Sequence, residues 1–135
     1  MTDDARYRHG IEEFRAARFF EAHEELELVW RPTPPGELRE FLQGMIQLAV
    51  SLEHWRRGNP RGAWGQYQKA LRRLGSLPSP FLQIDLSRLR ADALLFYTRV
   101  DLRGSLATLG FDAPDAPGGE KGEAAFPTPC WSPAP

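Results

Sequence analysis

One stretch of the sequence carries side chains at a spacing that zinc enzymes use. Residues 23–27 read HEELE, so His23 and Glu27 stand four positions apart with Glu24 between them. Side chains at i and i+4 share one face of a helix, and a histidine and a carboxylate are both acceptable zinc ligands. The pattern predicts His23 and Glu27 as metal ligands. It also predicts Glu24 as the general base that activates a bound water.

A second stretch supplies polar partners for this pair. Residues 41–52 contain no charged side chain, which is typical of a helix buried on most sides. Its polar arc, continued to His54, holds Gln43 and Gln47 where a solvent-facing arc would hold charged residues. We therefore expect this arc to face other protein. His54 is then the third metal ligand, and Gln43 and Gln47 orient Glu27 or a bound ligand. The implied cofactor is a divalent metal ion, zinc or manganese.

The same residues also allow a purely structural interpretation. His23, Glu27, Gln43, Gln47 and His54 would equally form a hydrogen-bonded network that specifies how two helices pair. The spacing of His23 and Glu27 recurs by chance on acidic helices, so it does not decide between the two. Both interpretations stay open at the level of the sequence.

The spacing of apolar residues predicts the elements that must position these side chains. Five helices are expected, over residues 4–17, 19–31, 37–57, 60–74 and 85–101. Gly58, Asn59 and Pro60 provide a C′ residue, an N-cap and a first helical residue between the third and fourth helices. His9 lies off the apolar stripe of the first helix and is expected to be exposed without a role. The predicted fold class is all-α: a compact bundle of about five helices built from antiparallel helical hairpins.

A change of composition divides the chain into a bundle and a tail. Residues 1–111 are expected to form the helical bundle domain. Residues 112–135 are rich in Pro, Gly and Ala and are expected to be disordered, because they bury too little apolar surface to offset their entropy. Phe126 and Trp131 are expected to dock on the bundle no more than transiently. On this interpretation, removing residues 113–135 leaves the stability unchanged.

Composition excludes several classes of function. The chain has 17 Lys and Arg against 18 Asp and Glu, and a net charge of −1 gives no reason to expect nucleic acid or an anionic membrane as partner. The single cysteine, Cys130, excludes a disulfide framework and a cysteine-based metal site. The N-terminus lacks an apolar signal segment, so a cytoplasmic location is expected. The expected partner is a small-molecule substrate or another protein.

Three blocks of sequence resemble a known family. They are FEAHEELELVW at residues 20–30, FLQGMIQLA at residues 41–49, and His54 followed by RGNPRGA at residues 57–63. In this order they resemble the domain of unknown function 309 family over roughly residues 7–100. The resemblance implies an all-helical bundle and the general label of predicted metal-dependent hydrolase, without an established substrate. Ala17 departs from the family pattern, which usually has Gly in this turn.

Two functions from different classes follow. The first is a metal-dependent hydrolase that acts on a small substrate at the His/Glu/Gln cluster between the second and third helices. The alternative is a non-enzymatic, tetratricopeptide-like module for a protein partner, because residues 14–30 align loosely onto residues 55–71. The enzyme requires an open pocket that reaches His23 and Glu27. The module requires an exposed apolar groove over the second and fourth helices.

Overall fold

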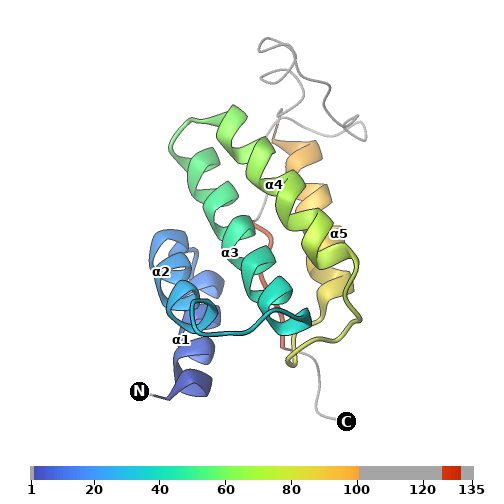
Figure 1. Cartoon of the computed structure of the whole chain (residues 1–135). Coiled ribbons are helices and arrows are strands. Elements are labelled where there is room, and N and C mark those ends of the chain that lie inside the picture. Colours follow the sequence, from blue (N-terminus) through green and yellow to red (C-terminus); the bar gives the residue numbers. More distant parts are fainter. Residues whose placement is uncertain (1, 101–125, 132–135) are drawn as a thin grey trace.

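Each predicted helix is present in the computed structural model, which describes residues 2–100 and 126–131. The helices are α1 (Asp3–Arg15), α2 (Phe19–Trp30), α3 (Glu37–Arg56), α4 (Pro60–Gly75) and α5 (Leu86–Arg99). Figure 1 shows α1 and α2 paired on one side of α3, with α4 and α5 on the other side. No element of the described residues is a strand, and none of their helices is long and apolar enough to cross a membrane. The predicted all-α class is confirmed.

The ends of the helices follow local signals in the sequence. Gly58 has a φ of +79°, and the Asn59 side chain accepts a hydrogen bond of 3.0 Å from the Gly62 backbone N–H. Pro60 then begins α4, as predicted. In the turn between α1 and α2, Ala17 has a φ of +59°, a left-handed conformation that favours glycine. The departure from the family pattern at Ala17 therefore falls where it costs backbone strain.

Two glycines mark the closest approaches within the helical hairpins. A Cβ atom on Gly44 of α3 would lie 2.7 Å from the Leu74 side chain of α4. A Cβ atom on Gly10 of α1 would lie 2.9 Å from the Leu26 side chain of α2. Both distances are shorter than a packed side chain allows, so each hairpin depends on a missing side chain at this point.

A buried hydroxyl network joins α3, α4 and α5. The Tyr97 hydroxyl donates to Ser51 Oγ, which donates to the Ala63 carbonyl oxygen. Tyr97 and Ser51 are both fully buried. Burial raises the pKa of the Tyr97 hydroxyl, so it stays a donor at neutral pH. Ser51 belongs to the polar arc predicted for α3, and this network gives it a structural role.

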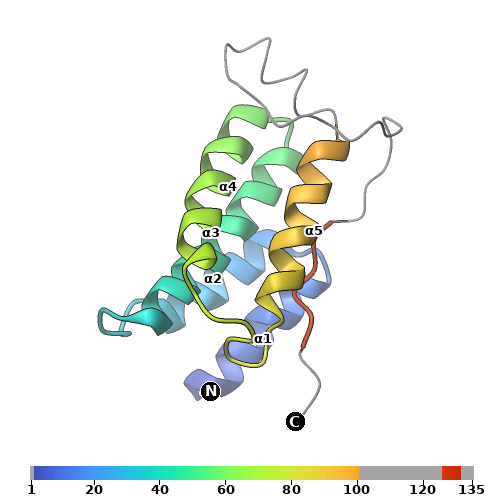
Figure 2. The ribbon, with the colours of Figure 1, turned by 90° about the vertical axis from the view of Figure 1, so that its right-hand side faces the viewer.

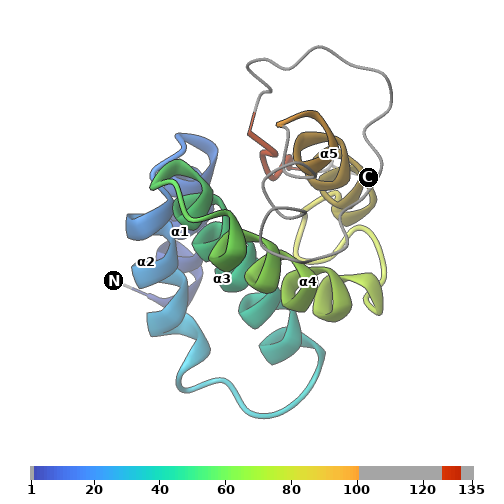
Figure 3. The ribbon, with the colours of Figure 1, turned by 90° about the horizontal axis from the view of Figure 1, so that it is seen from above.

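The tail interpretation is wrong for residues 126–131, here called the C-terminal segment. Figures 2 and 3 show this segment, in red, running between α5 and α1. The Phe126 ring lies 5.1 Å from the Phe19 ring and 5.3 Å from the Phe96 ring. The Trp131 indole N–H donates a hydrogen bond of 2.9 Å to Glu12. Both aromatic residues are therefore docked on the bundle. The disorder expected for residues 112–125 and 132–135 lies outside the described residues, and so does the predicted domain boundary at residue 111.

A strained turn after α4 helps to hold the C-terminal segment. Phe81 and Ile84 exchange backbone hydrogen bonds of 3.0 and 2.8 Å around Leu82 and Gln83, whose φ angles are +43° and +65°. Ile84 also forms an isolated antiparallel bridge with Trp131. Two consecutive left-handed residues that are not glycine cost energy, and they persist only where the surroundings enforce them. We call the surface formed by α1, α5 and residues 81–85 the α1–α5 groove.

Candidate functional site

A pocket of about 240 Å³ opens between α2 and α3. Its lining consists of Phe19, Phe20, His23, Val50, Glu53, His54 and Arg57. Two of the predicted ligands, His23 and His54, thus face one hollow although they come from different helices. We call this hollow the α2–α3 pocket. The aromatic side chains of α2 form apolar walls, whereas the imidazoles and Arg57 provide the polar groups.

Glu27 holds the ring of His23. Glu27 Oε2 lies 3.3 Å from His23 Nε2, and the two side chains are 31% and 28% exposed. Glu27 Oε1 in turn lies 3.4 Å from the Arg31 guanidinium. A carboxylate beside Nε2 favours the tautomer with a proton on that nitrogen and leaves Nδ1 with a free electron pair. The predicted pairing of residues i and i+4 on α2 is therefore present.

His54 has a structural contact that the sequence interpretation did not include. His54 Nδ1 lies 3.2 Å from Asn59 Nδ2, and Asn59 is the N-cap of α4. A Cβ atom on Gly62 would lie 3.0 Å from the His54 ring and 2.6 Å from Asn59 Nδ2. The family block from His54 to Gly62 thus packs the turn between α3 and α4, in addition to supplying a side chain to the pocket.

Glu53 is a charged pocket residue that the sequence interpretation missed. Burial disfavours its ionised form, but hydrogen bonds from Arg56 at 2.6 Å and Arg57 at 3.0 Å outweigh this effect. The net result is that the pKa of Glu53 lies below its ordinary value. The spacing of Glu53 with Arg56 and Arg57, at i+3 and i+4, was the available signal. Glu53 therefore stays ionised, and it holds two arginines at one edge of the pocket.

Four of the six predicted site residues do not line this pocket: Glu27, which contacts His23 from outside the lining, and Glu24, Gln43 and Gln47. Glu24 is exposed on α2, Gln43 is half-buried on α3, and neither belongs to the pocket lining. Gln47 is buried, and its side-chain carbonyl oxygen has no hydrogen-bond partner among the described residues. A buried, unpartnered amide oxygen has a desolvation cost that nothing in this region offsets. The roles predicted for Glu24, Gln43 and Gln47 are not supported by their positions.

Only two of the three predicted metal ligands, His23 and Glu27, lie next to each other in the structure. Within residues 2–100 and 126–131, no group of three or more His, Cys, Asp or Glu side chains is arranged to hold a metal ion. His23 and Glu27 form a two-residue fragment, and the one partner recorded for the ring nitrogens of His54 is Asn59. A zinc site in an enzyme normally needs three protein ligands. The described residues do not fit the predicted zinc or manganese ion.

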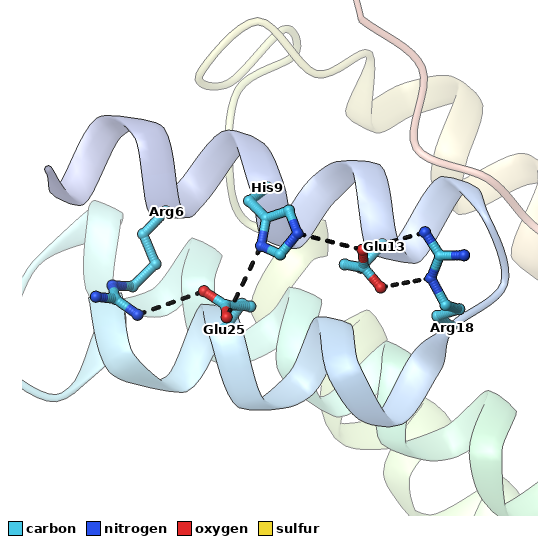
Figure 4. Close-up of polar contacts among 5 residues, drawn as sticks. All are labelled: Arg6, His9, Glu13, Arg18 and Glu25. Carbon is cyan, nitrogen blue, oxygen red and sulfur yellow. Dashed lines mark hydrogen bonds and ion pairs between the residues drawn. The ribbon is translucent and has the colours of Figure 1, made fainter. Parts of the chain in front are cut away.

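His9 is more engaged than its surface position predicts. Figure 4 shows its ring between two carboxylates, with Nε2 3.3 Å from Glu13 and Nδ1 3.8 Å from Glu25. Arg18 donates hydrogen bonds of 2.6 and 3.1 Å to Glu13, and Arg6 lies 3.5 Å from Glu25. The side chain is 47% exposed, so the predicted exposure is correct. The contact with Glu25, which links α1 to α2, was not part of the prediction.

Comparison with known proteins confirms the resemblance over part of the chain. Residues 7–65 match the family model described as "Domain of unknown function (DUF309)". The matched residues make up less than half of the chain; they extend from α1 into α4 and include both helices of the α2–α3 pocket.

Two relatives match stretches of 52 and 73 residues. A protein of Bacillus subtilis described as "Uncharacterized protein YpuF" is 50% identical over 52 residues, which is 38% of this chain and 30% of that protein. An "Uncharacterized protein" of Aquifex aeolicus is 33% identical over 73 residues, which is 54% of this chain and 22% of that protein. The chain thus spans less than a third of the length of these curated relatives. Neither description supplies an activity.

Proposed function

We propose that the α2–α3 pocket is the active site of a hydrolase that acts on a small ester or amide, with His23 as the general base. The observation that supports this proposal is the place of His23: its ring lines an open pocket and is held by Glu27 at 3.3 Å. An imidazole oriented by a carboxylate is a common general base near neutral pH. A pocket of about 240 Å³ suits a small substrate or one group of a larger substrate.

The chemistry uses only side chains of this chain. Nδ1 of His23 takes a proton from a water molecule, and the oxygen of that water forms a bond to the substrate carbonyl carbon. The carbonyl oxygen gains negative charge, and the guanidinium of Arg57 at the pocket edge stabilises it. The bond to the leaving group then breaks, and the imidazolium returns the proton to the departing oxygen or nitrogen. Phe20 and Val50 bind the apolar part of the substrate and exclude water.

The test is a hydrolysis assay on the purified full chain with a panel of small chromogenic esters and amides. We expect turnover by the wild type and a loss of at least about 100-fold in kcat in His23→Ala, because general-base catalysis contributes roughly 10²–10⁴-fold. Glu27→Gln should lower kcat less, by about 10-fold, because it only weakens the orientation of the ring. His9→Ala is the matched control, since His9 lies outside the pocket. Equal rates in the wild type and His23→Ala would exclude the proposal.

The same assay tests the predicted metal. Activity by an imidazole base persists after dialysis against EDTA. If activity is lost there and restored by Zn²⁺ or Mn²⁺, the active site is the metal-dependent one predicted from the sequence. In that case the same ions should raise the melting temperature of the wild type and not that of His23→Ala. The cytoplasmic location is likewise a prediction, and fractionation of cells would test it.

A non-enzymatic helical-hairpin module is the second candidate. It is favoured by the pairing of α1 with α2 and of α3 with α4, because α2 also packs on α3 and so joins the two hairpins side by side (Figure 1). Consecutive helical hairpins of this kind stack in repeat proteins that bind other proteins. Two results together would favour this module: no hydrolysis by the wild type, and binding of a protein partner that persists in the Phe20→Ala variant.

A further inference from the structure

The α1–α5 groove holds an extended proline-containing chain. Pro127 and Pro129 are buried in it, whereas Thr128 and Cys130 between and after them are half-buried. This alternation shows that every second residue faces the bundle, as expected for an extended chain. Prolines have no backbone N–H, so a surface that binds such a chain must contact its carbonyl oxygens and its rings.

The groove supplies donors to two successive carbonyl oxygens. Arg15 of α1 donates a hydrogen bond of 2.8 Å to the Pro129 carbonyl oxygen. The backbone N–H of Asp85, just before α5, donates one of 3.0 Å to the Cys130 carbonyl oxygen. The two donors come from opposite sides of the groove, so they fix the direction and register of the bound chain. Contacts of this type are independent of the side chains of the ligand, which allows other peptides to use them.

Two aromatic anchors hold the ends of the segment. Phe126 inserts its ring between Phe19 and Phe96, at centroid distances of 5.1 and 5.3 Å. At the other end, the Trp131 indole N–H donates to Glu12. The ring of Trp131 also lies beneath the guanidinium of Arg8, at 5.4 Å. Aromatic residues at both ends with prolines between them therefore define what the groove recognises.

The segment fills the groove incompletely. A cavity of about 270 Å³ remains between it and α5, lined on the helix by Arg88, Asp92 and Arg99, and on the segment by Pro127 and Cys130. The hollow is open to solvent, so a ligand that filled it would bury more apolar surface than the segment does. A peptide with larger side chains between the prolines would gain contacts there.

We propose that the α1–α5 groove is a docking site for extended peptides with an aromatic residue, two alternate prolines and a second aromatic residue, and that the C-terminal segment is its internal ligand. The proposal is independent of hydrolysis at the α2–α3 pocket. Because the segment belongs to the same chain as the groove, it competes at an effective concentration on the order of 1 mM. A partner peptide displaces the segment when it binds the open groove well below that concentration. The groove would thus bind only those partner peptides that compete successfully with the C-terminal segment.

The test uses a synthetic fluorescent peptide with the sequence of residues 125–132, carrying Cys130→Ser to prevent oxidation. The full chain with Trp131→Ala has a weakened internal ligand, and we expect it to bind the peptide at least 10-fold more tightly than the wild type by fluorescence anisotropy. Adding Arg15→Ala to this variant should weaken binding at least 5-fold, because the donor to the Pro129 carbonyl is lost. Arg72→Ala, an exposed arginine on α4, is the matched control and should not change binding.

A second measurement on the wild type keeps the proposal falsifiable if the variants do not fold. Excess unlabelled peptide should shift the backbone amide resonances of Cys130 and Trp131 in the ¹⁵N-labelled chain as the segment leaves the groove. A peptide with both aromatic residues changed to alanine should not shift them. Unmoved resonances, or equal peptide binding with and without Arg15→Ala, would overturn the proposal. Dimers of the unliganded wild type that the peptide dissociates would also overturn it, because the segment would then bind a second copy.

Discussion

Phe19 lines the α2–α3 pocket and also contacts Phe126 of the segment in the α1–α5 groove, but the pocket and the groove arise from different kinds of sequence information. The pocket is formed by two helices that are close in the sequence, and its polar side chains lie at helical spacing. The groove is completed by residues 126–131, which contact Glu12 and Arg15 more than 110 positions away. The pocket is open and partly exposed, whereas the groove is already occupied. Their comparison shows that an open surface and one covered by the chain itself can lie on two sides of a single aromatic residue.

This difference implies different responses to substitution. Exposed residues of the pocket, such as Phe20, should affect chemistry with little effect on stability, because they make few buried contacts. Residues that close the groove or bring the helices together should affect stability. The predictions below test this distinction in order of expected size.

The largest effect is expected at the close contact on the side of α3 that packs against α4. Gly44→Leu should lower the free energy of unfolding by about 2 kcal/mol or more, because even a Cβ atom would lie 2.7 Å from Leu74. Chemical denaturation followed by circular dichroism measures this. Gly65→Ala on α4 is the control, since a Cβ atom there has no neighbour within 4 Å and alanine favours a helix. An unchanged midpoint in Gly44→Leu would mean that this face of α3 is open.

Removal of the groove anchor should have the next largest effect. Phe126→Ala should cost about 1–2 kcal/mol, which is below the roughly 3–5 kcal/mol of a fully buried phenylalanine because the ring is only half-buried. Denaturation of the full chain measures the loss. Phe20→Ala in the pocket wall, where the side chain is 46% exposed, should stay within about 0.5 kcal/mol. Equal stabilities of the two variants would mean that the contacts of the groove stabilise the fold no more than those of the pocket.

The turn beside His54 should show an intermediate effect. Asn59→Ala should cost about 1 kcal/mol, because it removes the N-cap bond to Gly62 and the contact with the His54 ring. Thermal melting measures this, and Asn59→Asp should retain most of the stability because aspartate also caps helices. A melting temperature unaffected by Asn59→Ala would mean that the contact between His54 and Asn59 does not stabilise the turn, and that His54 contributes to the pocket only.

The smallest effect concerns the network on α1 and α2. Hydrogen bonds from Arg18 hold the pKa of Glu13 below its ordinary value of 4.5. A lowered carboxylate pKa contributes stability that is complete above about pH 5 and is lost as the pH falls through the folded-state pKa. The wild type should therefore melt above Glu13→Gln at pH 6, with the difference shrinking toward pH 3. Arg18→Ala should reduce the difference, whereas a constant gap would contradict the assignment.

The parts of the fold that were predictable from the sequence depend on local signals. The five helices and the turn from Gly58 to Pro60 follow from apolar spacing, glycine and capping residues that act within a few positions. The pairing of His23 with Glu27 was predictable for the same reason, because residues at i and i+4 of a helix are always neighbours.

The parts that were not predictable depend on contacts across the fold. Helical periodicity places Gln43 and Gln47 on a face, but it does not say which neighbour covers that face, and they do not line the pocket. The C-terminal segment has no periodicity, and its composition is typical of disorder. Its docking depends on the separation of α1 and α5, which no single stretch of sequence encodes. His9 is a milder case, since its contact with Glu25 needs the packing of α1 on α2.

The distance in sequence between the C-terminal segment and its groove also has a consequence for the order of folding. The hairpins α1–α2 and α3–α4 bring together residues close in the chain, so their contacts can form early. The bond from Trp131 to Glu12 spans 119 positions, so its formation costs more loop-closure entropy than either hairpin does, and we expect it to form late in folding. A substitution in the segment should then accelerate unfolding and leave refolding unchanged. In stopped-flow measurements Phe126→Ala should raise the unfolding rate constant and leave the refolding rate constant unchanged. The docked segment would then slow the unfolding of a bundle that assembles without it.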